Sequence, residues 1–117
     1  MEMIETFPDD ENGDALRQMQ ESGDDLSRPR EIDFSVVFPG ELEAQTMATQ
    51  FRELGFAVTW KQADVVPNLP WDVVITKFMV PSHDAITALE HDLEVAAEPL
   101  GGRNDGWGCF ERPSHDH

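Results

Sequence analysis

The sequence predicts an α+β domain in which two helices cover one face of an antiparallel sheet. Residues 31–38 alternate between apolar and polar side chains, which is the period of a strand with one buried face. Residues 41–54 and 82–100 instead repeat apolar side chains every three or four positions, as amphipathic helices do. With the remaining strand-like segments the order is β-α-β-β-α-β, which predicts a ferredoxin-like βαββαβ sandwich.

An extra N-terminal helix is expected before the first strand. Asp14 can cap or start it, Leu16 and Met19 give it an apolar side, and Gly23 ends it. The chain is therefore divided into a flexible acidic N-terminus at 1–13, a single domain at 14–112 and a disordered tail at 113–117.

The first strand and first sandwich helix have the clearest patterns. The strand's favoured face consists of Ile32, Phe34, Val36 and Phe38. After the turn at Pro39-Gly40, the helix presents an apolar stripe of Ala44, Met47, Ala48, Phe51 and Leu54. Gly55 is suited to a left-handed C-terminal cap.

The second and third strands are expected at 56–60 and 71–80, joined by a loop at 67–70. The third strand is nearly continuous in apolar residues, which is typical of a central strand. Lys77 interrupts it. We place Ile75 and Met79 beside Lys77 on the sheet face that the two helices leave open, and we expect the N-terminal helix or a partner to cover that face.

The second sandwich helix follows Ser82, which can cap it, and Gly101-Gly102 ends it. Asn104-Asp105-Gly106 is a turn signal, because these residues tolerate positive φ, and a short last strand is expected at 106–111. Trp107 follows the turn between two glycines. One interpretation makes it a core residue at the start of an edge strand; the other makes it an exposed interaction hot spot.

The charge of the chain restricts its partners. Its net charge is −16, from 24 acidic and 8 basic residues. Direct nucleic-acid binding is disfavoured, because that binding depends on Lys and Arg neutralising phosphates. The same field attracts basic proteins. We expect no membrane helix, since the apolar runs are far shorter than about 20 residues, and a cytoplasmic location, since the acidic start does not resemble an export signal.

No motif indicates catalysis or a cofactor. The sequence has no Gly-x-Ser-x-Gly, no phosphate-binding glycine loop and no metal-binding Cys or His pattern. His83 and His91 lie eight positions apart, which is too far for one metal site, and His115 and His117 lie near the chain end. Cys109 is the single cysteine and is expected to be an ordinary packed thiol. We therefore expect no catalytic residue, no metal, no cofactor and no enzyme activity.

Several segments together resemble the family of regulator of ribonuclease E activity B. They are Asp25-Leu26-Ser27-Arg28-Pro29-Arg30-Glu31-Ile32-Asp33-Phe34, Leu54-Gly55-Phe56, Phe78-Met79-Val80-Pro81 and Asn104-Asp105-Gly106-Trp107-Gly108. The last is the most specific. The resemblance implies a ferredoxin-like sandwich and a cytoplasmic bacterial protein that binds ribonuclease E and inhibits RNA processing without catalysis of its own.

Two functions stay open at this point. The first is a regulatory domain that binds a ribonuclease E-type enzyme, or another basic protein, through an acidic surface. The second is a ferredoxin-like module that binds a ligand, or a second copy of itself, on the open sheet face. The candidate interaction residues are Asn104, Asp105, Gly106, Trp107, Gly108, Met79 and Pro81, and the candidate acidic surface is Asp9, Asp10, Glu11, Asp14, Asp24 and Asp25.

Overall fold

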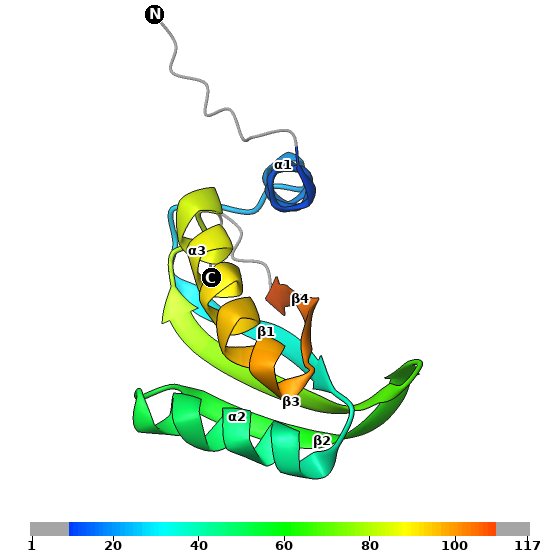
Figure 1. Ribbon diagram of the computed structural model, residues 1–117. Coiled ribbons are helices and arrows are strands. Elements are labelled where there is room, and N and C mark those ends of the chain that lie inside the picture. Colours follow the sequence, from blue (N-terminus) through cyan, green and yellow to red (C-terminus); the bar gives the residue numbers. More distant parts are fainter. Residues whose placement is uncertain (1–9, 110–117) are drawn as a thin grey trace, which may run out of the picture.

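The computed structural model describes residues 10–109, which form a four-stranded sheet with helices packed on one face (Figure 1). In chain order the elements are α1 (Glu11–Glu21), β1 (Arg30–Phe38), α2 (Glu41–Glu53), β2 (Ala57–Val66), β3 (Leu69–Met79), α3 (His83–Ala97), the short 3₁₀ helix η1 (Glu98–Leu100) and β4 (Arg103–Cys109). No helix in this described part of the chain is both long and apolar enough to cross a membrane.

The sheet has the strand order β2-β3-β1-β4, and every neighbouring pair is antiparallel. Helices α2 and α3 lie side by side on the same face of this sheet (Figure 1). This arrangement confirms the predicted α+β fold of the ferredoxin-like type. It also makes β4 an edge strand and β1 its inner neighbour.

The core lies between the sheet and its two main helices. The predicted face of β1, with Ile32, Phe34, Val36 and Phe38, is fully buried there. Each fully buried side chain of this size contributes roughly 1.5–3 kcal/mol of burial free energy. The helices supply the other half of the core through Ala44, Met47, Ala48, Phe51, Ile86, Leu89, Leu93 and Ala97.

The helix ends follow their predicted chemistry. The hydroxyl of Ser82 accepts a hydrogen bond from the backbone N–H of Ala85 at 3.2 Å, which caps α3. Gly55 has a φ of 98° just after α2, and Gly23 has a φ of 96° after α1. Both glycines therefore take the left-handed conformation that ends a helix at low cost.

The connection expected at 67–70 is shorter in the structure, since residues 69 and 70 already belong to β3. Strands β2 and β3 continue to a tight hairpin in which only Pro67 and Asn68 lie between them. Asn68 takes a φ of 67°, a left-handed conformation that asparagine tolerates better than most residues. Pro70 lies within β3 beside a register irregularity between Gln62 and Val66 of β2, where a missing N–H is less costly.

The expectation for the open sheet face is wrong. Ile75 is fully buried in the core beneath the helices, and Met79 packs against the same core. The alternation of β3 instead places Asp72, Val74, Thr76 and Phe78 on the open face. Thr76 donates a hydrogen bond to Asp33 of β1 at 2.6 Å, and Ser35 bonds with Asp72, so polar pairs occupy much of this face.

Helix α1 begins three residues earlier than Asp14 and is capped by Asp10. Residues 11–13, which we assigned to a flexible segment, form its first turn. Leu16 is fully buried in the common core, as expected of a domain helix. However, α1 packs beside α3 and not on the open face (Figure 1), so the predicted covering by this helix is wrong.

The connection from α1 to β1 is held by a buried ion pair. Arg30 is completely buried and donates a hydrogen bond from Nη1 to Asp24 Oδ2 at 2.6 Å. The same guanidinium donates to the carbonyls of Asp25 and Arg28. Burial acts to lower the pKa of Arg30, but the hydrogen bond and the charge of Asp24 act in the opposite direction, and the pKa is raised overall. Asp24 is only 5% exposed, so its assignment to an acidic surface is wrong.

Candidate functional site

The Asn-Asp-Gly-Trp-Gly segment forms a β-bulge and not the predicted turn. In the pairing of β4 with β1, Trp107 lies opposite Phe34 and Asn104 lies opposite Val36. The three steps along β4 from Asn104 to Trp107 therefore correspond to only two steps along β1, from Val36 to Phe34. Gly106 accommodates the extra residue of β4 with a φ of 102°. The bulge turns Asn104 and Trp107 toward the same face of the sheet, the one that carries the helices.

The first turn of α1 brings a second group of side chains to this place. Asp10 caps the helix by accepting a hydrogen bond from the N–H of Gly13 at 2.7 Å. Its carboxylate also lies 2.9 Å from Nε2 of His83, at the start of α3. The hydrogen bond from Gly13 and, next, that with His83 hold the pKa of Asp10 below its usual value. These contacts fix the start of α1 against α3.

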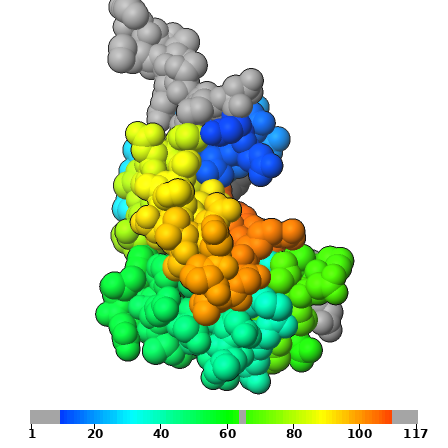
Figure 2. Space-filling view, viewed as in Figure 1, coloured from blue at the N-terminus to red at the C-terminus, as the bar shows by residue number. Residues whose placement is uncertain are grey.

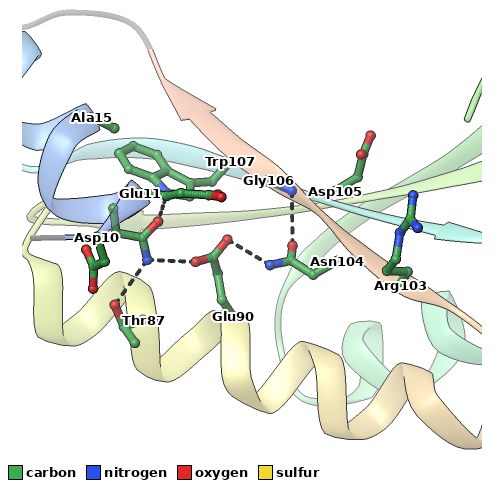
Figure 3. Close-up of a pocket in the computed structure, with 11 residues that line it drawn as sticks. Asp10, Glu11, Ala15, Thr87, Glu90, Arg103, Asn104, Asp105, Gly106 and Trp107 are labelled. Carbon is green, nitrogen blue, oxygen red and sulfur yellow. Dashed lines mark hydrogen bonds between the residues drawn. The ribbon is translucent and has the colours of Figure 1, made fainter.

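Asn12 is the centre of a hydrogen-bond network between α1, α3 and β4. Figure 3 shows the labelled members of this network, Thr87, Glu90, Asn104 and Trp107. Its Oδ1 accepts from the indole Nε1 of Trp107 at 2.8 Å. Its Nδ2 donates to Glu90 Oε1 at 2.7 Å and to Thr87 Oγ1 at 3.0 Å. The second oxygen of Glu90 accepts from Asn104 Nδ2 at 2.9 Å. One carboxylate thus receives amide donors from α1 and from β4.

These three elements enclose a cleft of about 650 Å³. In the space-filling view, α1 (blue) lies against α3 (yellow) and above β4 (orange) (Figure 2). The lining contains four carboxylates and one guanidinium, together with the indole of Trp107. It consists of Asp10, Glu11, Asn12, Ala15, Thr87, Glu90, Arg103, Asn104, Asp105, Gly106 and Trp107.

The chemistry of this lining suits the binding of cations and hydrogen-bond donors. It offers carboxylates, amides and an aromatic ring, but no serine, cysteine or histidine. Within residues 10–109, no group of three or more His, Cys, Asp or Glu side chains is arranged to hold a metal ion.

The structure brings only part of the predicted interaction residues together. Asn104, Asp105, Gly106 and Trp107 line the cleft, whereas Gly108 lines two smaller hollows beside it. Trp107 is half-buried and packs against the core, so it combines features of both interpretations. Pro81 is buried and Met79 half-buried, and neither reaches the cleft.

The predicted acidic residues are also divided. Asp10 and Glu11 line the cleft, while Asp14 is exposed on α1 and pairs with Arg17. Asp25 accepts hydrogen bonds from the backbone and hydroxyl of Ser27 in the connecting loop. Asp9 lies outside the described residues.

Sequence reasoning missed three members of the network: Asn12, Thr87 and Glu90. Thr87 and Glu90 are three positions apart on α3, so they share a helix face away from its apolar stripe. That spacing indicates a polar helix face, but it does not predict which residues contact that face. Asn12 was assigned to a flexible segment, and its contact with Trp107 joins residues 95 positions apart. No local sequence pattern predicts a contact between residues so far apart in the chain.

The fold and the cleft define a class of small α+β domain, ferredoxin-like in topology, with an acidic cleft beside its edge strand. The chain belongs to the family described as regulator of ribonuclease activity B, whose match covers residues 9–109. The match includes every element of the fold and the whole cleft, and it confirms the family resemblance. It also supports a regulatory role. A search among curated proteins finds no match to the chain.

Proposed function

We propose that this protein binds a ribonuclease E-type enzyme and inhibits its RNA processing without catalysis of its own. The observation that carries the proposal is the family match over residues 9–109, within which Asn104, Asp105, Gly106 and Trp107 form a wall of the acidic cleft. The net charge of −16 supports a basic protein segment as the target. It also disfavours direct competition by binding RNA.

The alternative function on the open sheet face receives less support. That proposal depended on Ile75 and Met79 as its apolar surface, but Ile75 belongs to the core beneath the helices and Met79 packs against that core. The open face instead carries polar pairs such as Thr76 with Asp33. A ligand or a second copy would have to displace these hydrogen bonds or bind over them.

The test is a cleavage assay with a ribonuclease E-type enzyme and a fluorescent RNA oligonucleotide. Increasing amounts of this protein should slow cleavage at about 0.1 M salt and should do so far less at about 1 M, because the screening length falls from about 10 Å to about 3 Å. Rates are normalised to the enzyme alone at each salt concentration. Calorimetry of the two proteins without RNA measures binding separately.

Two results would contradict the proposal. One is undiminished cleavage at an excess of this protein, together with no heat of binding at the lower salt. The other is tight binding of the oligonucleotide to this protein alone, measured by gel shift, since inhibition would then come from capture of the substrate.

A further inference from the structure

Two exposed carboxylates of the cleft have no side-chain partner in the described part of the chain. Glu11 and Asp105 are both exposed, and neither carboxylate forms a hydrogen bond or an ion pair with the described residues between 10 and 109. They come from different elements, α1 and β4, and border the same cleft (Figure 3). By contrast, Asp14 on the outer side of α1 is paired with Arg17. The cleft therefore presents negative charge that the fold does not use.

The deeper carboxylate of the cleft bonds to neutral donors. Glu90 accepts one hydrogen bond from Asn12 and one from Asn104, and both donors are amides. These bonds orient the carboxylate and bring no positive charge to it. The one basic residue of the lining, Arg103, lies at the end of the cleft opposite Trp107 (Figure 3). A cationic group entering beside Trp107 would thus meet an excess of negative charge.

The indole of Trp107 makes one side of the cleft aromatic. Its Nε1 donates to Asn12, which holds the ring in one orientation. Trp60 and Trp71, in contrast, contact each other with ring centroids 5.7 Å apart. No such ring contact, and no cation, lies against Trp107 in residues 10–109. An aromatic face next to unneutralised carboxylates is suited to a cation that is also flat.

Among protein side chains this description fits arginine better than lysine. A guanidinium is planar, stacks on an indole and can bond to two carboxylate oxygens at once. An ammonium group is compact and strongly hydrated, and it gains less from stacking. A cleft of about 650 Å³ also has room for a side chain together with its backbone.

We propose that the cleft between α1, α3 and β4 captures an arginine side chain of a partner protein, with the guanidinium stacked on Trp107 and paired with Glu11 and Asp105. This inference rests on the proposed function for the nature of the partner, and it names the residue that the site recognises. Arg103 at the far end of the cleft limits how much basic sequence can follow the captured arginine in that direction.

The experiment uses the full chain and two blocked nonapeptides, identical except that one contains arginine where the other contains lysine. Calorimetry should show the arginine peptide binding about fivefold more tightly, as expected for an exposed cation–π contact of about 1 kcal/mol. Equal affinities, or a preference for lysine, would overturn the proposal.

Glu11→Gln has a matched control in Glu41→Gln. Both residues are exposed and each is the first residue of its helix, but Glu41 lies on α2, away from the cleft. Glu11→Gln and Asp105→Asn should each weaken the arginine peptide by up to about fivefold, the range of a partly exposed ion pair. Glu41→Gln should leave the affinity unchanged. Equal effects of Glu11→Gln and Glu41→Gln would mean that the peptide senses net charge alone.

Fluorine NMR with 5-fluorotryptophan tests the stacking directly, since the chain has three tryptophans. Trp107→Phe assigns the resonance of Trp107. The arginine peptide should shift this resonance and leave those of Trp60 and Trp71 in place. Binding without a shift at Trp107 would overturn the proposal.

The two proposals fail in different ways. If the ribonuclease is inhibited and Glu11→Gln, Asp105→Asn and Glu41→Gln inhibit equally, the arginine site is wrong while the regulatory function stands. If the arginine peptide binds as described but no ribonuclease is inhibited, the site stands and its assigned partner class is wrong.

Discussion

Replacing Asp24 by asparagine should destabilise the protein far more than the same kind of exchange at an exposed acidic residue. The side chains of Asp24 and Arg30 are 0% and 1% exposed, so the guanidinium would remain buried beside a neutral amide. Removing one partner of a buried ion pair costs about 3–5 kcal/mol, because the remaining charge loses attraction that offset its desolvation. This is a large part of a typical stability of about 5–15 kcal/mol.

Urea unfolding followed by tryptophan fluorescence measures this change, because all three tryptophans lie in the sheet. A loss of 3–5 kcal/mol corresponds to a fall in Tm of roughly 12–20 °C at about 4 °C per kcal/mol. Asp14→Asn is the control: Asp14 is an exposed carboxylate on α1, and its exchange should cost less than about 1 kcal/mol.

A double-mutant cycle with Arg30→Met separates the pair from its surroundings. The double variant removes both charges, so it should be more stable than the sum of the two single losses predicts. It should not regain the wild-type stability, because the carbonyls of Asp25 and Arg28 also lose their donor. Additive losses, or an Asp24→Asn variant within 1 kcal/mol of wild type, would refute the reasoning.

Three further predictions concern the bulge, α1 and its cap. Gly106→Ala should lower the free energy of unfolding by about 1–3 kcal/mol, because Gly106 has a φ of 102°. Gly108 has equal free space around it but no positive φ, so Gly108→Ala should cost about 0.5 kcal/mol or less. Urea melts of the two variants should show this difference. Leu16→Ala should lower the free energy of unfolding by about 2–5 kcal/mol, whereas Leu42→Ala, at a 70% exposed site, should lower it by under about 0.5 kcal/mol. Equal losses in urea melts would contradict the placement of α1 in the core. The pKa of Asp10 is lowered by a backbone N–H and by a histidine, so its contribution to stability is complete above its usual value of 3.8 and is lost as the pH falls through the lowered pKa. Asp10→Asn should flatten stability over that acid range, and an unchanged pH profile would contradict this.

The elements predicted best were those whose pattern reports burial directly. The period-two face of β1 and the stripes of α2 and α3 reached the core as predicted, because alternation and helical spacing reflect which side of an element is buried. The exception is Leu54, which was predicted in the stripe of α2 but lies at the C-cap of this helix and is 69% exposed. The ends of β2 and β3 were predicted badly. Two prolines around Asn68 indicated a loop, but both fit a hairpin: Pro67 lies in its turn and Pro70 beside a register irregularity.

The site was predicted only where its signal is local. The segment from Asn104 to Gly106 was correctly expected to contain positive φ, but that conformation serves a bulge as well as it serves a turn. Whether a bulge or a turn forms depends on whether the neighbouring strand continues to pair on both sides of this segment, and β1 does so. Asn12 and Glu90 gave no signal, because their roles come from three elements meeting in space.

Helix α1 contributes both to the stability of the domain and to the walls of its cleft. Leu16 anchors the helix in the core, while Asn12, on the same helix, holds Trp107 and Glu90 in place. A change that releases α1 would therefore remove Glu11 from the cleft and free the indole of Trp107, even with the sheet intact. For this reason a variant that fails to bind is informative only when its α1 is shown to be docked. Retention of the Trp107 fluorine resonance at its wild-type position provides that evidence, because the hydrogen bond to Asn12 exists only in the docked state.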